Sequence, residues 1–85
     1  MPEELVGAVS HYFGKPGVAG IELTAELKVG DTIHVLGHTS DFTQRIDSIQ
    51  VEHESVDTAS GGDSIGVKVA ERVREHDQVF VVTAD

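Results

Sequence analysis

Apolar and polar residues alternate in short runs along most of the chain, and turn-forming residues separate these runs. Ala19, Ile21 and Leu23 occupy every second position, and so do Ile33 and Val35. A period of two places such residues on one face of a β-strand. The pattern predicts strands at residues 5–13, 18–24, 32–37, 42–53 and 65–69, a short extended piece around Val56, and a last strand at 78–83.

Turn signals connect these strands. Residues 14–17 read Gly-Lys-Pro-Gly, and proline cannot donate to a strand ladder while glycine tolerates a positive φ. The first two strands therefore form a hairpin. Residues 38–41 predict another turn, because Thr, Ser and Asp side chains bond their own backbone. Residues 70–77 are the one segment that suits a short helix, and the apolar last strand is typical of a central position in a sheet.

The run at residues 42–53 changes phase between its two halves. Ile46 belongs to one set of alternate positions, and Ile49 belongs to the other. One additional residue would return both sets to a single buried face. We therefore expect a β-bulge near Asp47 and Ser48.

One short frame occurs three times along the chain. It reads Val-Gly-Asp-Thr-Ile at residues 29–33, Gly-Gly-Asp-Ser-Ile at 61–65 and Glu-His-Asp-Gln-Val at 75–79. A functional site rarely needs three copies of one local frame. We interpret the aspartates as turn residues whose side chains bond free backbone amides. His76 takes the glycine position in the third copy, where it would adopt a positive φ at some cost in strain.

Six or seven short strands with turn signals every 8–12 residues or so predict an all-β domain. We expect a small closed antiparallel β-barrel, since closure removes the exposed edges of a sheet. A sandwich of two sheets is the alternative. The 85 residues form one domain, because the chain is too short for two.

Charge and composition exclude several classes of function. The net charge is −9, with 15 Asp and Glu against 6 Lys and Arg, of which only Arg72 and Arg74 lie close together. Direct nucleic-acid binding is therefore not expected, because it depends on cationic side chains. The absence of cysteine excludes thiolate metal sites. No apolar run approaches the roughly 20 residues of a membrane span, and no leader pattern opens the chain, so we expect a cytoplasmic protein with no membrane partner.

Candidate metal ligands and paired carboxylates are few. His34 and His38 would lie about 13 Å apart along a strand, which is too far for one zinc ion unless Gly37 bends the chain sharply. Glu52 and Glu54 would share a strand face, about 6.6 Å apart, but nothing in the sequence indicates a cleft around them. A small metal-dependent hydrolase built on His34, His38 and Glu52 stays a third alternative.

Nucleophilic and nucleotide-binding motifs are absent from the sequence. Ser10 and His11 are neighbours on one strand and would point to opposite faces, and no serine lies in a nucleophile elbow. The segment Gly-Lys-Pro-Gly does not match the phosphate loop of nucleotide triphosphatases. We therefore expect neither enzyme activity nor a cofactor.

The segment at residues 37–44 is the best candidate for a binding loop. On a structural interpretation it is a turn followed by an aromatic anchor in the core. On a functional interpretation it is a recognition loop, because loops on rigid β-scaffolds often carry binding residues. The predicted binding residues are His38, Thr39, Asp41, Phe42 and Arg45.

Three segments in order carry a family resemblance: "VGAVSHYF" at residues 6–13, "LKVGDTIHVLG" at 27–37 and "GGDSIGVKV" at 61–69. Together they resemble the barrel domain that follows the GTPase domain in translational GTPases such as elongation factor Tu. The resemblance extends over residues 6–82. It is closer to small stand-alone translation elongation factor-like proteins and to the C-terminal barrel of collagenase-like peptidases, through "GHTSDFTQ" and "VREHDQV".

This resemblance implies an elongation-factor domain-two-like barrel with a binding role. The GTPase motifs are missing, so GTP binding does not follow from it. We expect a non-enzymatic binding module that docks on a protein partner in translation, either a ribosome-associated factor or a peptidase. The alternative is an accessory domain that acts in trans with a collagenase-like peptidase or an RNA-modifying enzyme.

Overall fold

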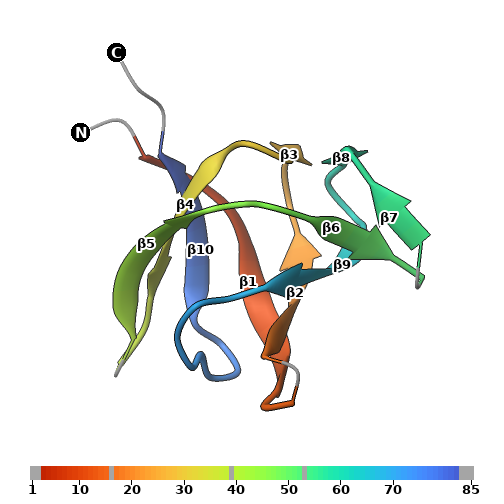
Figure 1. The fold of residues 1–85 in the computed structure, drawn as a ribbon. Helices are drawn as coiled ribbons and strands as arrows, with labels where there is room; N and C mark the ends of the chain where they lie inside the picture. The colour runs from red at the N-terminus through yellow and green to blue at the C-terminus, as the bar shows by residue number, and fades with distance from the viewer. Residues whose placement is uncertain (1–2, 16, 39, 53, 83–85) are drawn as a thin grey trace.

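The computed structural model describes residues 3–15, 17–38, 40–52 and 54–82, and these residues form ten strands and no helix. The strands are β1 (Glu3–Phe13), β2 (Val18–Leu23), β3 (Leu27–Lys28), β4 (Thr32–Leu36), β5 (Asp41–Arg45), β6 (Ile49–Val51), β7 (Glu54–Val56), β8 (Thr58–Ala59), β9 (Ser64–Lys68) and β10 (Gln78–Val82). One antiparallel sheet has the order β5-β4-β10-β1-β2-β9-β6-β7, and β3 pairs with β8 in a second sheet (Figure 1). Within the described ranges, no helix is long and apolar enough to cross a membrane.

The all-β prediction is confirmed, whereas the closed barrel is not. β5 and β7 are the two ends of the large sheet, and no strand ladder joins them among the residues that the structure describes. A side chain spans part of the opening instead. Gln44 Nε2 donates to the Lys68 carbonyl (2.9 Å), and Gln44 Oε1 accepts the Ala70 N–H (2.7 Å). We call this contact, between β5 and the chain at the end of β9, the Gln44 seam.

The strands with clear alternation form where the pattern predicts them. β1 and β2 make the expected hairpin, with Phe13 opposite Val18. Ile21 and Ile33 are 1% and 0% exposed, because their faces of β2 and β4 point into the core. β10 lies between β4 and β1, which confirms its central position.

The continuous strand and the bulge predicted at residues 42–53 are wrong. β5 ends at Arg45 and pairs with β4, whereas β6 begins at Ile49 and pairs with β9 near the other end of the sheet. Ile46 and Ile49 are both buried, at 1% and 0% exposed. The chain crosses between two parts of the sheet while both isoleucines stay in the core, and this crossover causes the change of phase.

The helix predicted at residues 70–77 does not form either. Val73 is 1% exposed and anchors the segment in the core, and the Arg74 N–H donates to the carboxylate of Asp77 at 2.9 Å. The two-residue strands β3 and β8 were not predicted, because two residues show no period. Their pairing buries Leu27 and Ala59, which are 0% and 2% exposed.

The three repeated aspartates form the same turn three times: the first turn at residues 28–31, the second at 60–63 and the third at 74–77. In each, the Asp carboxylate accepts the N–H of the first residue at 2.9 Å. The Asp N–H donates to the carbonyl of the same residue at 3.1 Å. The residue before the aspartate has a positive φ, as in type II turns; the values are 97° at Gly30, 96° at Gly62 and 76° at His76. The interpretation of the repeat as a turn is confirmed.

Each turn also pairs with one buried residue of a distant segment. The turn residue with positive φ donates its N–H to the carbonyl of the buried residue. The N–H of the buried residue in turn donates to the carbonyl of the turn aspartate. All six distances are 2.8–2.9 Å. Two residues opposite one make a G1-type β-bulge. The buried partners are Ile46 for the first turn, Leu23 for the second and Val9 for the third, all at most 3% exposed. Every turn therefore fixes one core residue.

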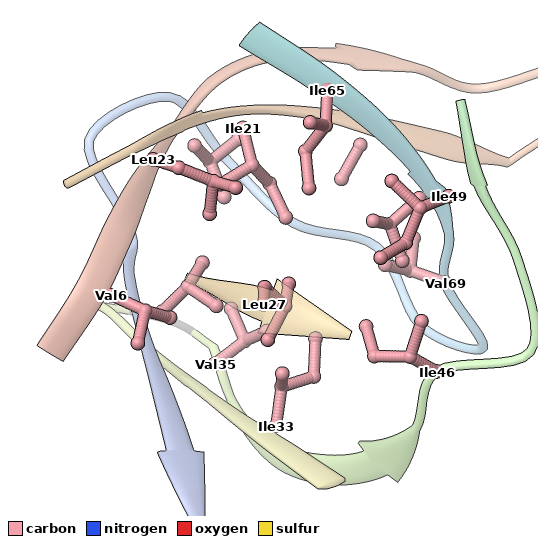
Figure 2. Packing of buried hydrophobic residues seen from close by; sticks show 14 of the residues in the cluster. Val6, Ile21, Leu23, Leu27, Ile33, Val35, Ile46, Ile49, Ile65 and Val69 are labelled. Carbon is pink, nitrogen blue, oxygen red and sulfur yellow. The ribbon is translucent and has the colours of Figure 1, made fainter. Parts of the chain in front are cut away.

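Aliphatic side chains fill the space that the strands enclose. Figure 2 shows Ile21 and Ile65 on one side of this core and Ile33, Val35 and Ile46 on the other. All of them are at most 3% exposed. Burying one side chain of this size contributes about 1.5–3 kcal/mol, so the core is the main stabilising term for so short a chain.

Replacing an aspartate of the repeated turn should destabilise the fold. We expect Asp31→Ala or Asp63→Ala to lower the free energy of unfolding by about 0.5–2 kcal/mol, by analogy with lost helix caps. Asp77→Ala should cost more, because Asp77 is only 4% exposed and its bond to the Arg74 amide is partly buried, whereas the bonds in the other two turns are exposed. Denaturant unfolding measures these values, with the exposed Asp47→Ala as the control. An unchanged stability in all three turn variants would contradict the structural role.

The Gln44 seam makes a prediction for one backbone amide. Gln44→Met removes both hydrogen bonds with little change of shape, so the Ala70 amide should exchange its hydrogen with solvent much faster than in the wild type. Gln44→Glu keeps an acceptor for the Ala70 N–H and should preserve most of its protection. Hydrogen exchange followed by NMR tests this, and equal exchange in both variants would show that the side chain does not protect the seam.

Candidate functional site

The structure distributes the predicted binding residues over different surroundings. Phe42 packs against the core, as the structural interpretation expects. Asp41 and Arg45 are exposed at opposite ends of β5, about 13 Å apart by strand rise. His38 is exposed beyond the end of β4, and Thr39 lies outside the described residues. These residues do not converge on one point.

Asp41 belongs instead to a cluster centred on His34. Asp41 Oδ1 lies 2.6 Å from Nε2 of His34, and Glu3 Oε2 lies 2.8 Å from Nδ1. The pairing of β4 with β5 on one side and with β10 and β1 on the other brings the three side chains together. The sequence gives little sign of this, because 31 positions separate Glu3 from His34.

The two carboxylates favour the protonated form of His34. The hydrogen bond to Asp41 is the largest cause that raises the pKa of His34 above 6.5; partial burial opposes it, and Glu3 adds to it. The ring is 17% exposed, whereas the Asp41 side chain is 74% exposed. A protonated imidazole donates to both carboxylates at once, so the cluster is a partly shielded ionic group at the surface.

This arrangement suits binding better than catalysis. Both ring nitrogens of His34 are engaged, so neither offers a lone pair to a metal ion or a substrate proton. Over the described ranges of the chain, no three His, Asp or Glu side chains are grouped to hold a metal ion. The hydrolase alternative with His34, His38 and Glu52 therefore has no geometric support.

Apolar side chains surround the His34 cluster on the outer face of the sheet. Phe80 lies opposite His34 in the ladder, with ring centroids 6.3 Å apart, and Leu5 lies opposite Phe80. Leu5 is 45% exposed and Leu36 is 38% exposed. Exposed apolar groups that gather around a polar centre are typical of interaction surfaces. We call this surface the outer patch; its members are Glu3, Leu5, His34, Leu36, Asp41 and Phe80.

A groove lies on the other half of the sheet, over β2, β9 and β6. Gly20 of β2 is paired with Gly66 of β9, so no side chain covers the backbone there. The groove has a volume of about 430 Å³, and its side chains come from Phe13, Lys15, Val18, Gln50, Glu52 and Ser64. Glu52 has a φ of 52° in the connection between β6 and β7. The predicted pair of Glu52 and Glu54 on one strand face is therefore wrong.

A register shift around Ser10 corrects another expectation. The shift lies within the β1–β2 pairing. Ser10 Oγ and His11 Cβ lie 3.4 and 3.6 Å from where a Cβ on Gly20 would be, so both residues flank the same outer position instead of opposite faces. His11 also approaches the Phe13 ring, with centroids 4.5 Å apart, and Nδ1 of His11 lies 3.6 Å from the carboxylate of Glu75.

Sequence comparison relates the chain to parts of larger proteases, although no family model matches it. It is 38% identical over 78 residues to an uncharacterized protease of Methanocaldococcus jannaschii, a match that covers 91% of this chain and 19% of that protein. It is 35% identical over 77 residues to a collagenase of Porphyromonas gingivalis, covering 88% and 21%. The chain therefore spans about a fifth of the length of the curated relatives that it matches.

Structure comparison finds a domain with the same fold. The C-terminal domain of a Geobacillus thermoleovorans protein described as a "putative U32 peptidase" matches with a TM-score of 0.88 at 23% identity, over 94% of this chain and 93% of that one. Its selenomethionine variant matches with a TM-score of 0.85 at 24% identity, over 89% and 96%. The chain shares the fold of this domain. The expected likeness to collagenase-like peptidases is thus supported, and the likeness to translational GTPases is not.

The His34 cluster predicts a pH dependence of stability. Folding raises the pKa of His34 above its ordinary 6.5. The contribution of the protonated His34 to the free energy of unfolding is therefore complete below pH 6.5, and it is lost as pH rises through the pKa of the folded state. The free energy of unfolding of the wild type should therefore fall relative to His34→Gln over this interval. NMR titration of the ring together with denaturant unfolding at several pH values tests both parts. A His34 pKa at or below 6.5 would contradict the cluster.

Proposed function

We propose that this chain is a non-catalytic accessory domain of a collagenase-like, U32-type peptidase, and that it docks on the peptidase body. The observation that carries the proposal is the 38% identity between nearly the whole chain and a fifth of a protease. The fold shared with a C-terminal peptidase domain supports the same assignment. Docking in translation has no comparable support among these relatives.

The arrangement of polar groups supports binding as the task of the domain. The His34 ring is held by two carboxylates, and its bonds leave no free nitrogen. Such a group can fix the position of a partner through charge and hydrogen bonds. The peptide-bond chemistry would then belong to the peptidase body.

The outer patch is the proposed docking surface, and its place in the chain supports this choice. Glu3, near the start of β1, pairs with Val82 at the end of β10, so both ends of the described fold lie beside the patch (Figure 1). In the Geobacillus protein the matching domain is C-terminal, so the rest of that protein precedes β1. A body joined at this end lies next to Leu5 and Phe80.

The chemistry of the patch also suits such a partner. Leu5 and Leu36 are 45% and 38% exposed, and covering them removes apolar area from water. Glu3 and Asp41 give the patch negative charge and would meet basic side chains of the peptidase body. The same face serves whether the body is joined to the domain or is a separate chain.

Two surface variants test the docking. Leu36→Asp should weaken binding about tenfold or more by placing a charge in the apolar contact. Val29→Asp is the matched control, because Val29 is also 38% exposed but lies in the first turn. Tagged wild type and both variants are used to capture partners from an extract of the source organism, and affinity for the purified peptidase is then measured by calorimetry.

The outcomes separate the two functions. Enrichment of a U32-type peptidase by the wild type and the control, but not by Leu36→Asp, is the expected result. Enrichment of ribosomal proteins instead would favour the role in translation and overturn the proposal. Binding of the peptidase with equal affinity to all three proteins would keep the partner but exclude the outer patch as the docking surface.

A further inference from the structure

The third turn (residues 74–77) repeats the backbone of the other two turns with a different side chain at its strained position. Its residue with positive φ is His76, at 76°, whereas the first and second turns have glycine there. A histidine in this region is strained, and strain of this kind clusters at functional sites. Glycine would satisfy the backbone, so the imidazole needs another explanation.

A hollow of about 460 Å³ opens beside this turn. Arg72 and Arg74 line it, and they are two of only six Lys and Arg residues in a chain of net charge −9. Across the part of the chain that the structure describes, no ion pair joins either arginine to a carboxylate. The hollow is lined by His11, Tyr12, Arg72, Val73, Arg74, Glu75 and His76.

The backbone that carries the arginines is held in place before any ligand binds. Val73 is 1% exposed and anchors the segment between them, and Arg72 and Arg74 on either side of it are exposed. The Arg74 N–H donates to the Asp77 carboxylate (2.9 Å), and the His76 N–H donates to the Val9 carbonyl (2.8 Å). Groups held in this way lose less freedom on binding.

We propose that this hollow binds the phosphate group of a small phosphate monoester. Two guanidinium groups provide forked N–H donors that match phosphate oxygens, and the imidazoles of His11 and His76 each add an N–H. Glu75 also lines the hollow, 3.6 Å from His11, and adds negative charge there. This charge and the acidic remainder of the chain oppose a long polyanion, so a compact dianion fits better than a nucleic acid.

Titration of the labelled protein with phenyl phosphate tests the site. At constant ionic strength, we expect saturable NMR shifts of the Arg72 and Arg74 side-chain N–H groups and of the His76 ring, with a Kd of about 1 mM or tighter. Sodium chloride and a short single-stranded oligonucleotide serve as comparison ligands.

The other two turns supply substitutions that keep the turn intact. Arg74→Ser introduces the residue that the second turn has at the same position, Ser60, and should raise the Kd about tenfold. Lys28→Ser makes the same change in the first turn and should leave the Kd unchanged. His76→Gly copies Gly30 and should weaken phosphate binding severalfold. The same change should raise Tm by about 2–6 °C, because it removes the strain.

Three results would overturn the proposal. The first is an equal effect of Lys28→Ser and Arg74→Ser, or shifts that chloride reproduces, because either indicates general screening. The second is unchanged affinity in both Arg74→Ser and His76→Gly. The third is saturable binding of the oligonucleotide but not of phenyl phosphate, which would assign the hollow to nucleic acid.

Discussion

The bond from an aspartate carboxylate to the amide three residues earlier is the interaction on which this fold depends. It occurs three times, at 2.9 Å each time, and each copy stands directly before a five-residue strand: β4, β9 or β10. Each of these turns also pairs with one buried residue, Ile46, Leu23 or Val9. The three turns thus fix the starts of three strands and the positions of three core residues together. They define the register of the strands, which contacts between aliphatic side chains alone would specify less well.

Local patterns in the sequence predict local parts of this structure well. The repeated Gly-Asp frame predicts the turns, and alternation predicts the buried faces of β2 and β4, because both depend on residues close in the chain. The crossover of the chain after β5 could not be predicted from such local patterns. Ile46 pairs with the first turn, whereas Ile49 pairs with Val67 of β9. An interpretation of residues 42–53 as one strand does not allow such a change of partner. Residues 70–77 form no helix because Val73 and Asp77 are engaged by the rest of the fold.

The candidate surfaces were harder to predict than the fold. Asp41 meets His34 through the pairing of β4 with β5, whereas Glu3 reaches His34 because β10 lies between β1 and β4 in the sheet. Sequence spacing contains no information on that order of strands. The predicted loop contributed Asp41 to the outer patch, while Phe42 turned inward. The hollow at the third turn had one visible sign, the histidine in a glycine position, and its significance depends on the neighbouring arginines and on His11, which comes from β1.

The Gln44 seam has a mechanical consequence. Along the sheet, backbone ladders join neighbouring strands, whereas across the seam the described residues are joined by one side-chain amide that makes two hydrogen bonds. The seam can therefore open with the loss of only these two side-chain hydrogen bonds. The outer-patch half and the groove half of the sheet therefore share the β1–β2 ladder and the covalent crossover at residues 46–48, whereas Gln44 alone links their facing edges across the seam among the described residues.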